Sequence, residues 1–298
     1  MKLSFYFATL LGIMICTNAN AQVTFKTEYY GMSNYQDRDR KDIGSSKGSA
    51  VVYEGSANLP ISIKMNEKNQ PSIWALGIGG AYVSLNNKNF TEDLVLSEIV
   101  NLQIGIMHMR PINEKWSMMA NFGIGVFSPD TRFSEFTFQN VGNLGVIFIR
   151  NINPNLSVGG GLAINNTFGY PMVFPTLFLD WKYEGNFIIK VSMMEGGKIY
   201  AGYNVNKSLT LSLFTGMSGQ GAFFKQDGKN MIFTHQCMEV GLCSEFKVGK
   251  GFTIPISIGG AMRDAYYAER RLKSFFSGGS GGFDVAPAVS IGIKYGMN

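Results

Sequence analysis

The sequence predicts an all-β fold, a transmembrane antiparallel up-and-down β-barrel of about 14 strands, with about 12 as the alternative count. The first observation is a period of two, in which bulky apolar residues alternate with Gly, Ser, Thr or Asn, as in residues 252–258 (FTIPISI). The second is that short and longer polar connections alternate along the chain. The third is that no apolar run after the first 21 residues approaches the ~18 residues of a membrane-spanning helix. A bulky apolar face backed by a small or polar face suits a sheet that closes on itself in lipid.

Each strand is placed where the alternation is unbroken and turn residues bound it. In chain order the predicted strands cover residues 23–35, 48–65, 71–85, 94–111, 116–127, 136–151, 156–165, 173–184, 186–194, 197–204, 208–224, 230–248, 252–268 and 284–297. The alternation does not decide whether residues 23–47 form part of the wall or a plug inside it.

The connections are of two kinds. After the even-numbered strands they are short and rich in Asn, Gly, Pro or Lys, at residues 65–70, 112–115, 152–155, 184–185, 205–207 and 249–251. After most odd-numbered strands they are longer and polar, at residues 36–47, 86–93, 128–135, 166–172, 225–229 and 269–282, with 195–196 as the short exception. Short turns in the periplasm and longer loops outside the cell are typical of outer-membrane barrels.

The first 21 residues predict a cleavable signal peptide, which leaves residues 22–298 as one barrel domain. Lys2 precedes an apolar run, and the small residues Ala19 and Ala21 directly precede the expected cleavage site before Gln22. Lipidation at Cys16 is the alternative, but a lipoprotein signal has a small residue before the cysteine and this chain has Ile15. We therefore expect export.

The composition favours a membrane barrel over a soluble exported domain. Only 16% of the residues are charged, against about 25% in soluble domains, and the chain holds 36 Gly, 23 Phe and 13 Tyr. The formal net charge of +5 is spread over predicted loops and sheet faces, so it does not indicate a nucleic-acid partner.

Cys237 and Cys243 are expected on one strand about 20 Å apart, too far for a disulfide.

The tryptophans indicate which face meets lipid. Trp74 and Trp116 follow a predicted short turn, Trp181 precedes one, and each shares the alternation of the apolar face. We therefore predict an aromatic girdle on the periplasmic side, as barrels have at the membrane interface. It consists of Trp74, Trp116, Trp181, Phe187, Tyr203, Phe252 and Tyr295.

The opposite face carries ionisable residues that we predict to line the lumen. They are Asp180, Lys182, Lys190, His235, Glu239, Glu245, Lys247 and Arg263. Such a mixture either sets the ion preference of a pore or pairs within a narrow, closed barrel, and the sequence leaves both open.

No enzyme and no cofactor or metal is expected. His108 and His235 are the only histidines, and His235 and Glu239 are expected roughly 13 Å apart on one strand face, too far to share a metal ion. Neither histidine is followed by the His-x-Ser-Asn pattern of barrel phospholipases. The glycine clusters lie inside predicted strands with no helix after them, unlike a phosphate-binding loop.

Residues 156–204 resemble a family of outer-membrane β-barrels that is catalogued as a domain of unknown function. The resemblance rests on the Gly159–Gly161 strand, the 175–183 strand (PTLFLDWKY) and the hairpin at Asn186 and Phe187. It implies a barrel fold and does not indicate an activity.

The last strand also resembles the signal read by the barrel-assembly machinery, at Ser290, Gly292, Tyr295 and Met297, although the chain does not end on an aromatic residue.

From these features we expect a barrel in the outer membrane of a Gram-negative bacterium, in contact with outer-membrane lipid. Its expected function is that of a channel or transporter for a small solute, without catalysis. The alternative is a closed structural or interaction barrel that holds a protein partner or anchors the envelope. The sequence does not identify the cargo, the oligomeric state or a protein partner.

Overall fold

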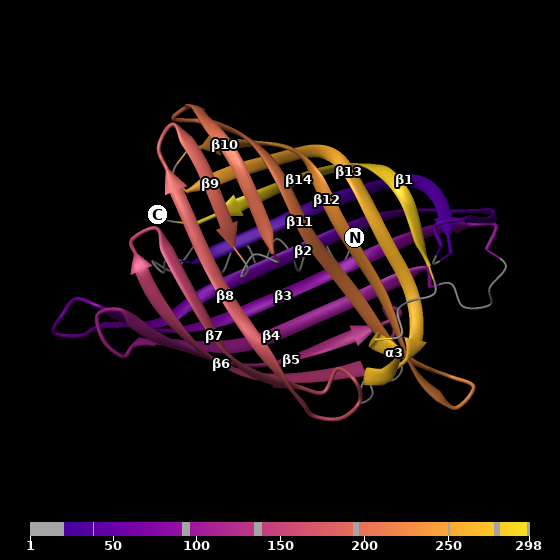
Figure 1. Ribbon diagram of the computed structural model, residues 1–298, viewed down its shortest axis with the longest axis horizontal. Coiled ribbons are helices and arrows are strands. Elements are labelled where there is room, and N and C mark those ends of the chain that lie inside the picture. The colour runs from indigo at the N-terminus through magenta and orange to yellow at the C-terminus, as the bar shows by residue number, and fades with distance from the viewer. Residues whose placement is uncertain are drawn as a thin grey trace.

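In the computed structural model the described part of the chain forms one closed antiparallel barrel of fourteen strands (Figure 1). The structure describes residues 21–37, 39–90, 96–133, 139–192, 197–249, 251–276 and 281–296. The elements are β1 (Gln22–Gln36), β2 (Asp42–Met65), β3 (Pro71–Lys88), β4 (Glu98–Pro111), β5 (Trp116–Ser128), β6 (Asn140–Asn153), β7 (Leu156–Asn165), β8 (Met172–Glu184), β9 (Phe187–Ser192), β10 (Lys198–Asn206), β11 (Leu209–Gln226), β12 (Lys229–Val248), β13 (Phe252–Glu269), the short helix α3 (Leu272–Phe276) and β14 (Gly282–Tyr295). The predicted fold class is confirmed, with fourteen strands and not twelve.

Closure of the barrel is made by β1, which pairs with β2 on one side and with β14 on the other. Val23 lies opposite Tyr295 of β14 and opposite Ala57 of β2. A closed sheet has no free edge along the seam, so the backbone groups there are paired, as a lipid environment requires. Residues 22–36 and 42–65 are therefore wall strands and not a plug.

The two faces of the wall differ as the alternation predicts. Large apolar side chains stand on the outside, for example Leu177 and Ile61, which are 73% and 63% exposed. The side chains between them point inward and are small or polar along much of the wall, as Gly159, Gly161 and Ala163 are on β7. Among the described residues no helix is long and apolar enough to cross a membrane.

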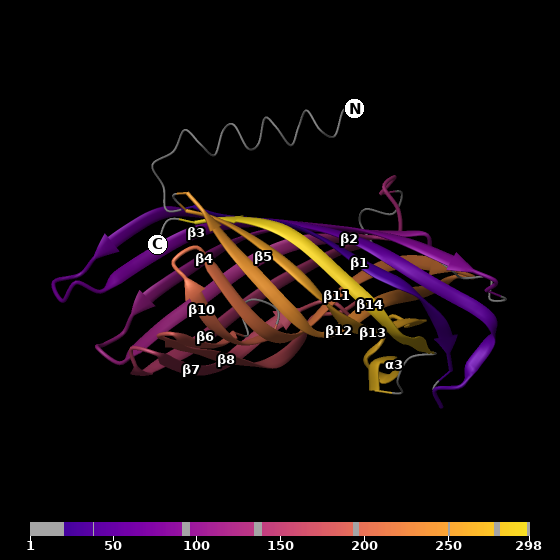
Figure 2. The same cartoon turned by 90° about the horizontal axis from the view of Figure 1, so that it is seen from above.

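The two rims of the barrel differ in their connections. At the short-turn rim, residues 66–70, 112–115, 154–155, 185–186, 207–208 and 249–251 join the strands, and β1 begins and β14 ends there. Several of these turns share one device, in which an Asn side-chain oxygen accepts the N–H two residues later, as Asn113 does from Lys115 and Asn206 does from Ser208. This explains why these turns are rich in Asn. The long-loop rim, which carries α3, lies at the other end of the barrel (Figure 2).

Several strand ends at the long-loop rim differ from the prediction, since β4 begins only at Glu98 and β6 at Asn140, whereas β2 and β3 are longer than predicted. β2 begins at Asp42 and β3 continues to Lys88. The predicted longer loop at residues 225–229 is wrong, since only Asp227 and Gly228 connect β11 to β12, and both have positive φ angles of 50° and 72°. Such a two-residue turn matches the twist of a hairpin, so the two strands stay paired to their tips.

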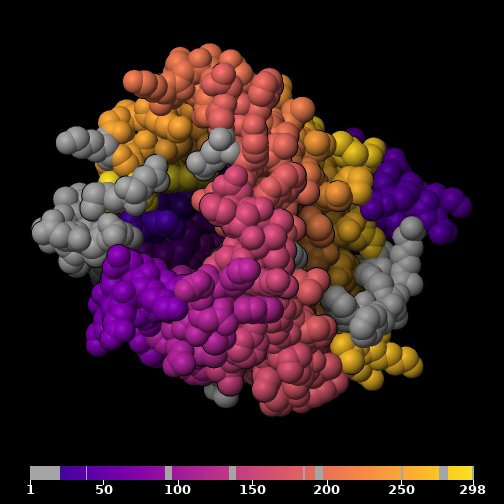
Figure 3. All heavy atoms as spheres, turned by 60° about the vertical axis from the view of Figure 1, so that its left-hand side comes forward, coloured from indigo at the N-terminus to yellow at the C-terminus, as the bar shows by residue number. Residues whose placement is uncertain are grey.

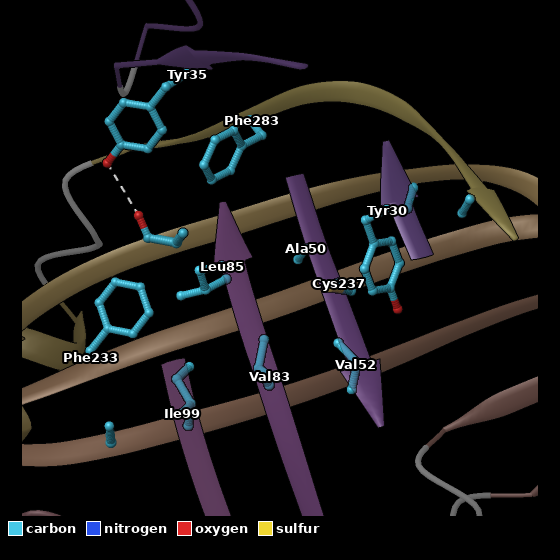
Figure 4. Packing of buried hydrophobic residues seen from close by; sticks show 14 of the residues in the cluster. Tyr30, Tyr35, Ala50, Val52, Val83, Leu85, Ile99, Phe233, Cys237 and Phe283 are labelled. Carbon is cyan, nitrogen blue, oxygen red and sulfur yellow. Dashed lines mark hydrogen bonds between the residues drawn. The ribbon is translucent and has the colours of Figure 1, made fainter. Parts of the chain in front are cut away.

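The interior of the barrel near the long-loop rim is filled by an apolar core. Its side chains come from β1 to β4 on one side and from β11 to β14 on the other, and they point toward one another (Figure 4). Alanines on these strands make room for the rings of Tyr30, Tyr35 and Phe283, so large and small side chains interdigitate. The core comprises Tyr30, Tyr35, Ala50, Val52, Val83, Leu85, Ile99, Ala222, Phe224, Phe233, Cys237, Ala261, Ala265, Phe283 and Ala288.

Candidate functional site in the barrel lumen

The part of β11 beyond Thr215, toward the long-loop rim, crosses the lumen and is the outer part of this strand. On its β10 side, the described pairing of β11 reaches only as far as Thr215, which lies opposite Ile199, while β11 itself continues to Gln226. Beyond that point β11 approaches β4 and β5. The Asn101 side chain of β4 donates to the Gly221 carbonyl at 2.6 Å and accepts from the Gly221 N–H at 3.3 Å. Because β4 and β11 are diametrically opposite in the strand order, this contact bridges the whole barrel.

A second contact across the lumen lies beside the Asn101–Gly221 bridge. Gln220 of β11 donates to Glu54 of β2 at 3.0 Å. Further along β11, the rings of Phe223 and Phe127 of β5 are 5.7 Å apart, centroid to centroid. The outer part of β11 is therefore held against the opposite wall by polar and aromatic contacts.

A network of charged side chains lies inside the barrel next to the bridge. The Lys26 ammonium is 2.8 Å from a carboxylate oxygen of Glu28 and 2.8 Å from one of Glu54. The Tyr30 hydroxyl contacts the Glu28 carboxylate at 3.4 Å and donates to the carboxylate of Glu239 on β12. The Glu28 side chain is only 5% exposed, and a buried carboxylate of this kind is tolerated because a cation and a hydroxyl contact it.

Arg263 and His235 are completely buried between this network and the apolar core. One guanidinium nitrogen of Arg263, Nη2, donates to the Gly48 carbonyl at 2.6 Å, and its carbon Cζ lies 4.2 Å from the centre of the Phe283 ring. Within the described residues, Nε and Nη1 of Arg263 have no hydrogen-bond partner. Nδ1 of His235 lies 3.2 Å from the Gln220 side-chain oxygen.

A cavity of about 490 Å³ lies on the short-turn side of the bridge. Lys26, Glu54, Asn101 and Gln220 line the end where the bridge lies. The rest of the wall is lined by glycines and apolar residues of β3 to β5 and by the amides Asn58, Gln103, Asn121 and Asn143. Figure 3, which brings the short-turn side forward, shows a hollow with residues of the first strands inside it.

The glycines of the cavity wall are required by close packing of the strands. Gly105 pairs with Gly77 on one side and with Gly123 on the other. A Cβ atom added at Gly105 would lie 2.9 Å from the Phe122 carbonyl oxygen, closer than side chains tolerate. The absence of side chains at these positions leaves the space that the cavity occupies.

Residues 17–296 match the model of a protein family described as a domain of unknown function (DUF6268). The chain belongs to this family. The resemblance predicted from the sequence is confirmed, and it extends over nearly the whole chain. No curated protein matches the sequence.

Solved structures similar to this DUF6268 chain are outer-membrane barrels. An outer membrane channel from Pseudomonas putida F1 is 8% identical, with a TM-score of 0.43, and the match covers 94% of this chain and 96% of that one. The translocator domain of the autotransporter NalP from Neisseria meningitidis is 14% identical, with a TM-score of 0.34 and coverage of 99% and 97%. The KdgM porin is 7% identical, with a TM-score of 0.31 and coverage of 93% and 99%. Similarities this weak do not identify a ligand for the DUF6268 chain.

Three of the residues predicted to line the lumen are brought together in the DUF6268 barrel, namely His235, Glu239 and Arg263. All three lie inside the half of the barrel that is nearer the long-loop rim, where His235 and Arg263 are buried from solvent. Glu245 lies further toward the short-turn rim and contacts the Lys294 ammonium at 3.2 Å, and Lys247 is exposed there.

The other three, Asp180, Lys182 and Lys190, lie on β8 and β9. Lys182 is directly opposite Lys190 on the same face of the sheet, and Asp180 is opposite Ser192. β8 is diametrically opposite β1 in the strand order, so these residues lie on the far wall from the network around Lys26.

The sequence analysis did not find the residues of β1, β2, β4 and β11 that build the network and the bridge. Lys26, Glu28 and Tyr30 alternate with Phe25 and Tyr29, so the alternation alone places them on the inner face. A basic and an acidic residue two positions apart on an inward face was the available signal. Asn101 carries no such signal, because its partner is backbone on a distant strand.

No group of three His, Cys, Asp or Glu side chains suited to a metal ion occurs among the described residues. Cys237 and Cys243 are buried free cysteines.

The residues of the predicted girdle lie on the outside near the short-turn rim. There Phe187 contacts Tyr203 and Phe252 contacts Tyr295, at ring-centroid distances of 5.3 Å and 4.7 Å.

The predicted terminal signals fall largely outside the described residues. Of the predicted signal peptide only Ala21 is described, and of the assembly signal Met297 is not. Ser290, Gly292 and Tyr295 lie on β14, which pairs with β1 at the seam of the barrel.

Proposed function

We propose that this chain is exported to the outer membrane of a Gram-negative bacterium and passes a small polar solute through its lumen without catalysing a reaction. The observation that carries the proposal is the cavity of about 490 Å³ on the short-turn side of the bridge. Its volume is large enough for a small solute, and the amide side chains in its lining offer hydrogen bonds beside apolar and glycine surface.

The short-turn rim corresponds to the periplasmic side in this proposal, because outer-membrane barrels have short turns there. The cavity then faces the periplasm, and the outer part of β11 separates it from the cell exterior. A solute crosses only when β11 moves away from β4 and β5, so the described arrangement is the closed state of a gate.

Few polar contacts hold the gate across the lumen, which supports a movable element, although the Phe223–Phe127 ring contact and the packing of Ala222 and Phe224 in the core also hold it. The bridge consists of two hydrogen bonds between Asn101 and Gly221, beside one from Gln220 to Glu54. Each is worth about 0.5–3 kcal/mol, depending on charge, so the closed state can be favoured without being permanent.

Conductance measured in a planar lipid bilayer tests this proposal. We expect rare openings of the wild-type barrel, and a several-fold higher open fraction for the double variant Asn101→Ala/Gln220→Ala, which lacks the bridging side chains. Gln103→Ala is the matched control, because Gln103 lines the same cavity from the same strand without crossing the lumen. If folded wild-type and double-variant barrels both stay silent in the bilayer, the transport proposal is wrong.

A closed structural or interaction barrel is the second candidate. The apolar core favours it, because an interior packed between β1 to β4 and β11 to β14 leaves no path through that half of the molecule. This candidate predicts no conductance from any of the three proteins and a protein partner that purifies with the barrel.

A further inference from the structure

Two arginines and a tryptophan form a basic patch on the outside of the barrel near the short-turn rim. Arg110 on β4, Trp116 on β5 and Arg150 on β6 all point outward and are exposed. They share this face with the apolar residues Met118, Phe122 and Phe148, of which Phe122 and Phe148 are 57% and 46% exposed. The patch therefore adjoins the surface that faces lipid.

The register of the three strands fixes the spacing of the patch. Arg150 lies directly opposite Trp116, with its guanidinium carbon 5.9 Å from the centre of the indole ring. Arg110 lies opposite Met118, two residues further from the rim. Neighbouring strands are about 4.8 Å apart and residues rise about 3.3 Å, so the two arginine Cα atoms are roughly 12 Å apart. Two long side chains on this spacing can contact a single group above Trp116 and Met118.

Neither guanidinium of the patch has an acidic partner in the part of the chain that the structure describes. Among the described residues, no carboxylate oxygen lies within 4.0 Å of Arg110 or Arg150. The acidic residue of the adjoining turn, Glu114, is bound by the Lys68 ammonium at 2.9 Å. This hydrogen bond lowers the pKa of Glu114, so the residue stays ionised and paired with Lys68. The patch thus carries two uncompensated positive charges next to an apolar surface.

Aromatic side chains extend the patch along the rim. The Trp74 ring stacks on His108 of β4, with centroids 4.1 Å apart and an interplanar angle of 19°. Nδ1 of His108 lies 3.2 Å from the Ile73 carbonyl, which orients the ring on the wall. Amphipathic rings at this height are suited to the headgroup level of a bilayer.

We propose that Arg110 and Arg150 bind the phosphate of an anionic phospholipid, with its acyl chains lying over Met118, Phe122 and Phe148. Guanidinium groups recognise phosphate through paired hydrogen bonds, and two uncompensated cations favour a headgroup with net negative charge over a zwitterionic one. The position of the patch on the lipid face selects a lipid over a soluble phosphate. The site does not depend on whether the lumen conducts.

Native mass spectrometry of the full-length barrel tests the site. The protein is purified in detergent and incubated with equal amounts of phosphatidylglycerol and phosphatidylcholine, and the retained lipid is counted. We expect a preference for phosphatidylglycerol on the order of tenfold, and its loss in the double variant Arg110→Gln/Arg150→Gln. Arg132→Gln is the control, because Arg132 is an exposed cation beyond the other end of β5.

Folding of each variant is verified by its heat-modifiable migration in gel electrophoresis, and only folded barrels are compared. The single variant Arg150→Gln also removes the contact with Trp116, and we expect it to lose part of the preference. Equal retention of the two lipids by the wild type overturns the proposal, as does an unchanged preference in the folded double variant.

Discussion

Asn101 on β4 binds both backbone groups of Gly221 on β11, although the two strands lie on opposite sides of the barrel. The contact pairs backbone groups that the described part of β10 does not reach. Described pairing of β11 with β10 ends at Thr215, six residues before Gly221. A side-chain amide offers an N–H and a carbonyl oxygen side by side, so Asn101 can donate to the carbonyl and accept from the N–H of the same residue.

Replacement of Asn101 by Leu should destabilise the barrel by about 2–4 kcal/mol. The variant keeps the volume of the side chain but leaves the N–H and carbonyl of the half-buried Gly221 unpaired, and an unpaired buried group costs about 1–3 kcal/mol. Urea unfolding followed by tryptophan fluorescence measures the change. Gln103→Leu on the same strand faces the cavity and should change stability by less than about 1 kcal/mol. Equal losses in the two variants contradict this role of Asn101.

The packed interior predicts a difference between two isoleucines of β4. Ile99 is completely buried in the core, whereas Ile104 is 46% exposed on the outside. Ile99→Ala should cost about 2–5 kcal/mol, because the surrounding side chains cannot fill the space that it leaves. Ile104→Ala should cost clearly less, since lipid or detergent replaces the lost contacts. Urea unfolding in one detergent compares the two, and similar losses would indicate a hydrated interior.

The strands and turns were predictable because their signals are local. β7 covers residues 156–165 as predicted, since its alternation is bounded by turn residues on both sides. The same alternation places Tyr30, Val52 and Ile99 on the inner face. It contains no information on the distance between opposite walls, so it could not distinguish residues that line a wide lumen from residues that meet in a core.

The bridge and the buried position of Arg263 were not predictable for the same reason. The sequence analysis placed Arg263 on the inner face, where it lies, but its surroundings come from β1, β2 and β14. The predicted bounds already made β11 much longer than β10, and the described pairing between them stops at Thr215. They did not show that the unpaired part of β11 meets β4, because β4 is distant in the sequence and only barrel closure places it opposite β11.

Replacement of Arg263 by Met should leave stability unchanged or raise it by about 1–3 kcal/mol. Arg263 is fully buried, no carboxylate lies within 4.0 Å among the described residues, and two of its nitrogens have no hydrogen-bond partner there. An apolar side chain of similar length removes this unfavourable burial and still packs on Phe283. Arg263→Ala is the contrasting variant, because it also leaves an empty space and should destabilise. A large loss in Arg263→Met, measured by urea unfolding, would mean that the charge itself stabilises the fold.

Removal of Lys26 should be strongly destabilising, and a second change should repair it in part. In Lys26→Met the carboxylates of Glu28 and Glu54 lose their shared cation, and breaking such a buried pair costs about 3–5 kcal/mol. Lys26→Met/Glu28→Gln removes one of the two charges and should recover about half of that loss. Thermal unfolding of the single and double variants measures the recovery. Lys68→Met is the control, because its partner Glu114 is exposed and the pair contributes little.

Arg270 ties the segment after β13 to the connection between β7 and β8 at the long-loop rim. Its Nε donates to the Thr167 carbonyl at 2.7 Å and its Nη2 to the Asn166 carbonyl at 2.9 Å. The guanidinium carbon lies 3.8 Å from the centre of the Phe223 ring. Burial lowers the pKa of Arg270 to about 10, so the side chain is still protonated at neutral pH.

Replacement of Arg270 by Gln should release this segment and expose it to protease. The shorter side chain cannot reach both carbonyls, so we expect trypsin to cleave after Arg271 and Lys273 several times faster than in the wild type. Because the pKa stays well above neutral, the difference should be the same at pH 7 and pH 8. Arg40→Gln removes an exposed ion pair with Asp264 at the same rim and should leave these cleavage rates unchanged. Mass spectrometry of the fragments identifies the sites, and equal rates in Arg270→Gln and the wild type would show that Arg270 does not hold the segment.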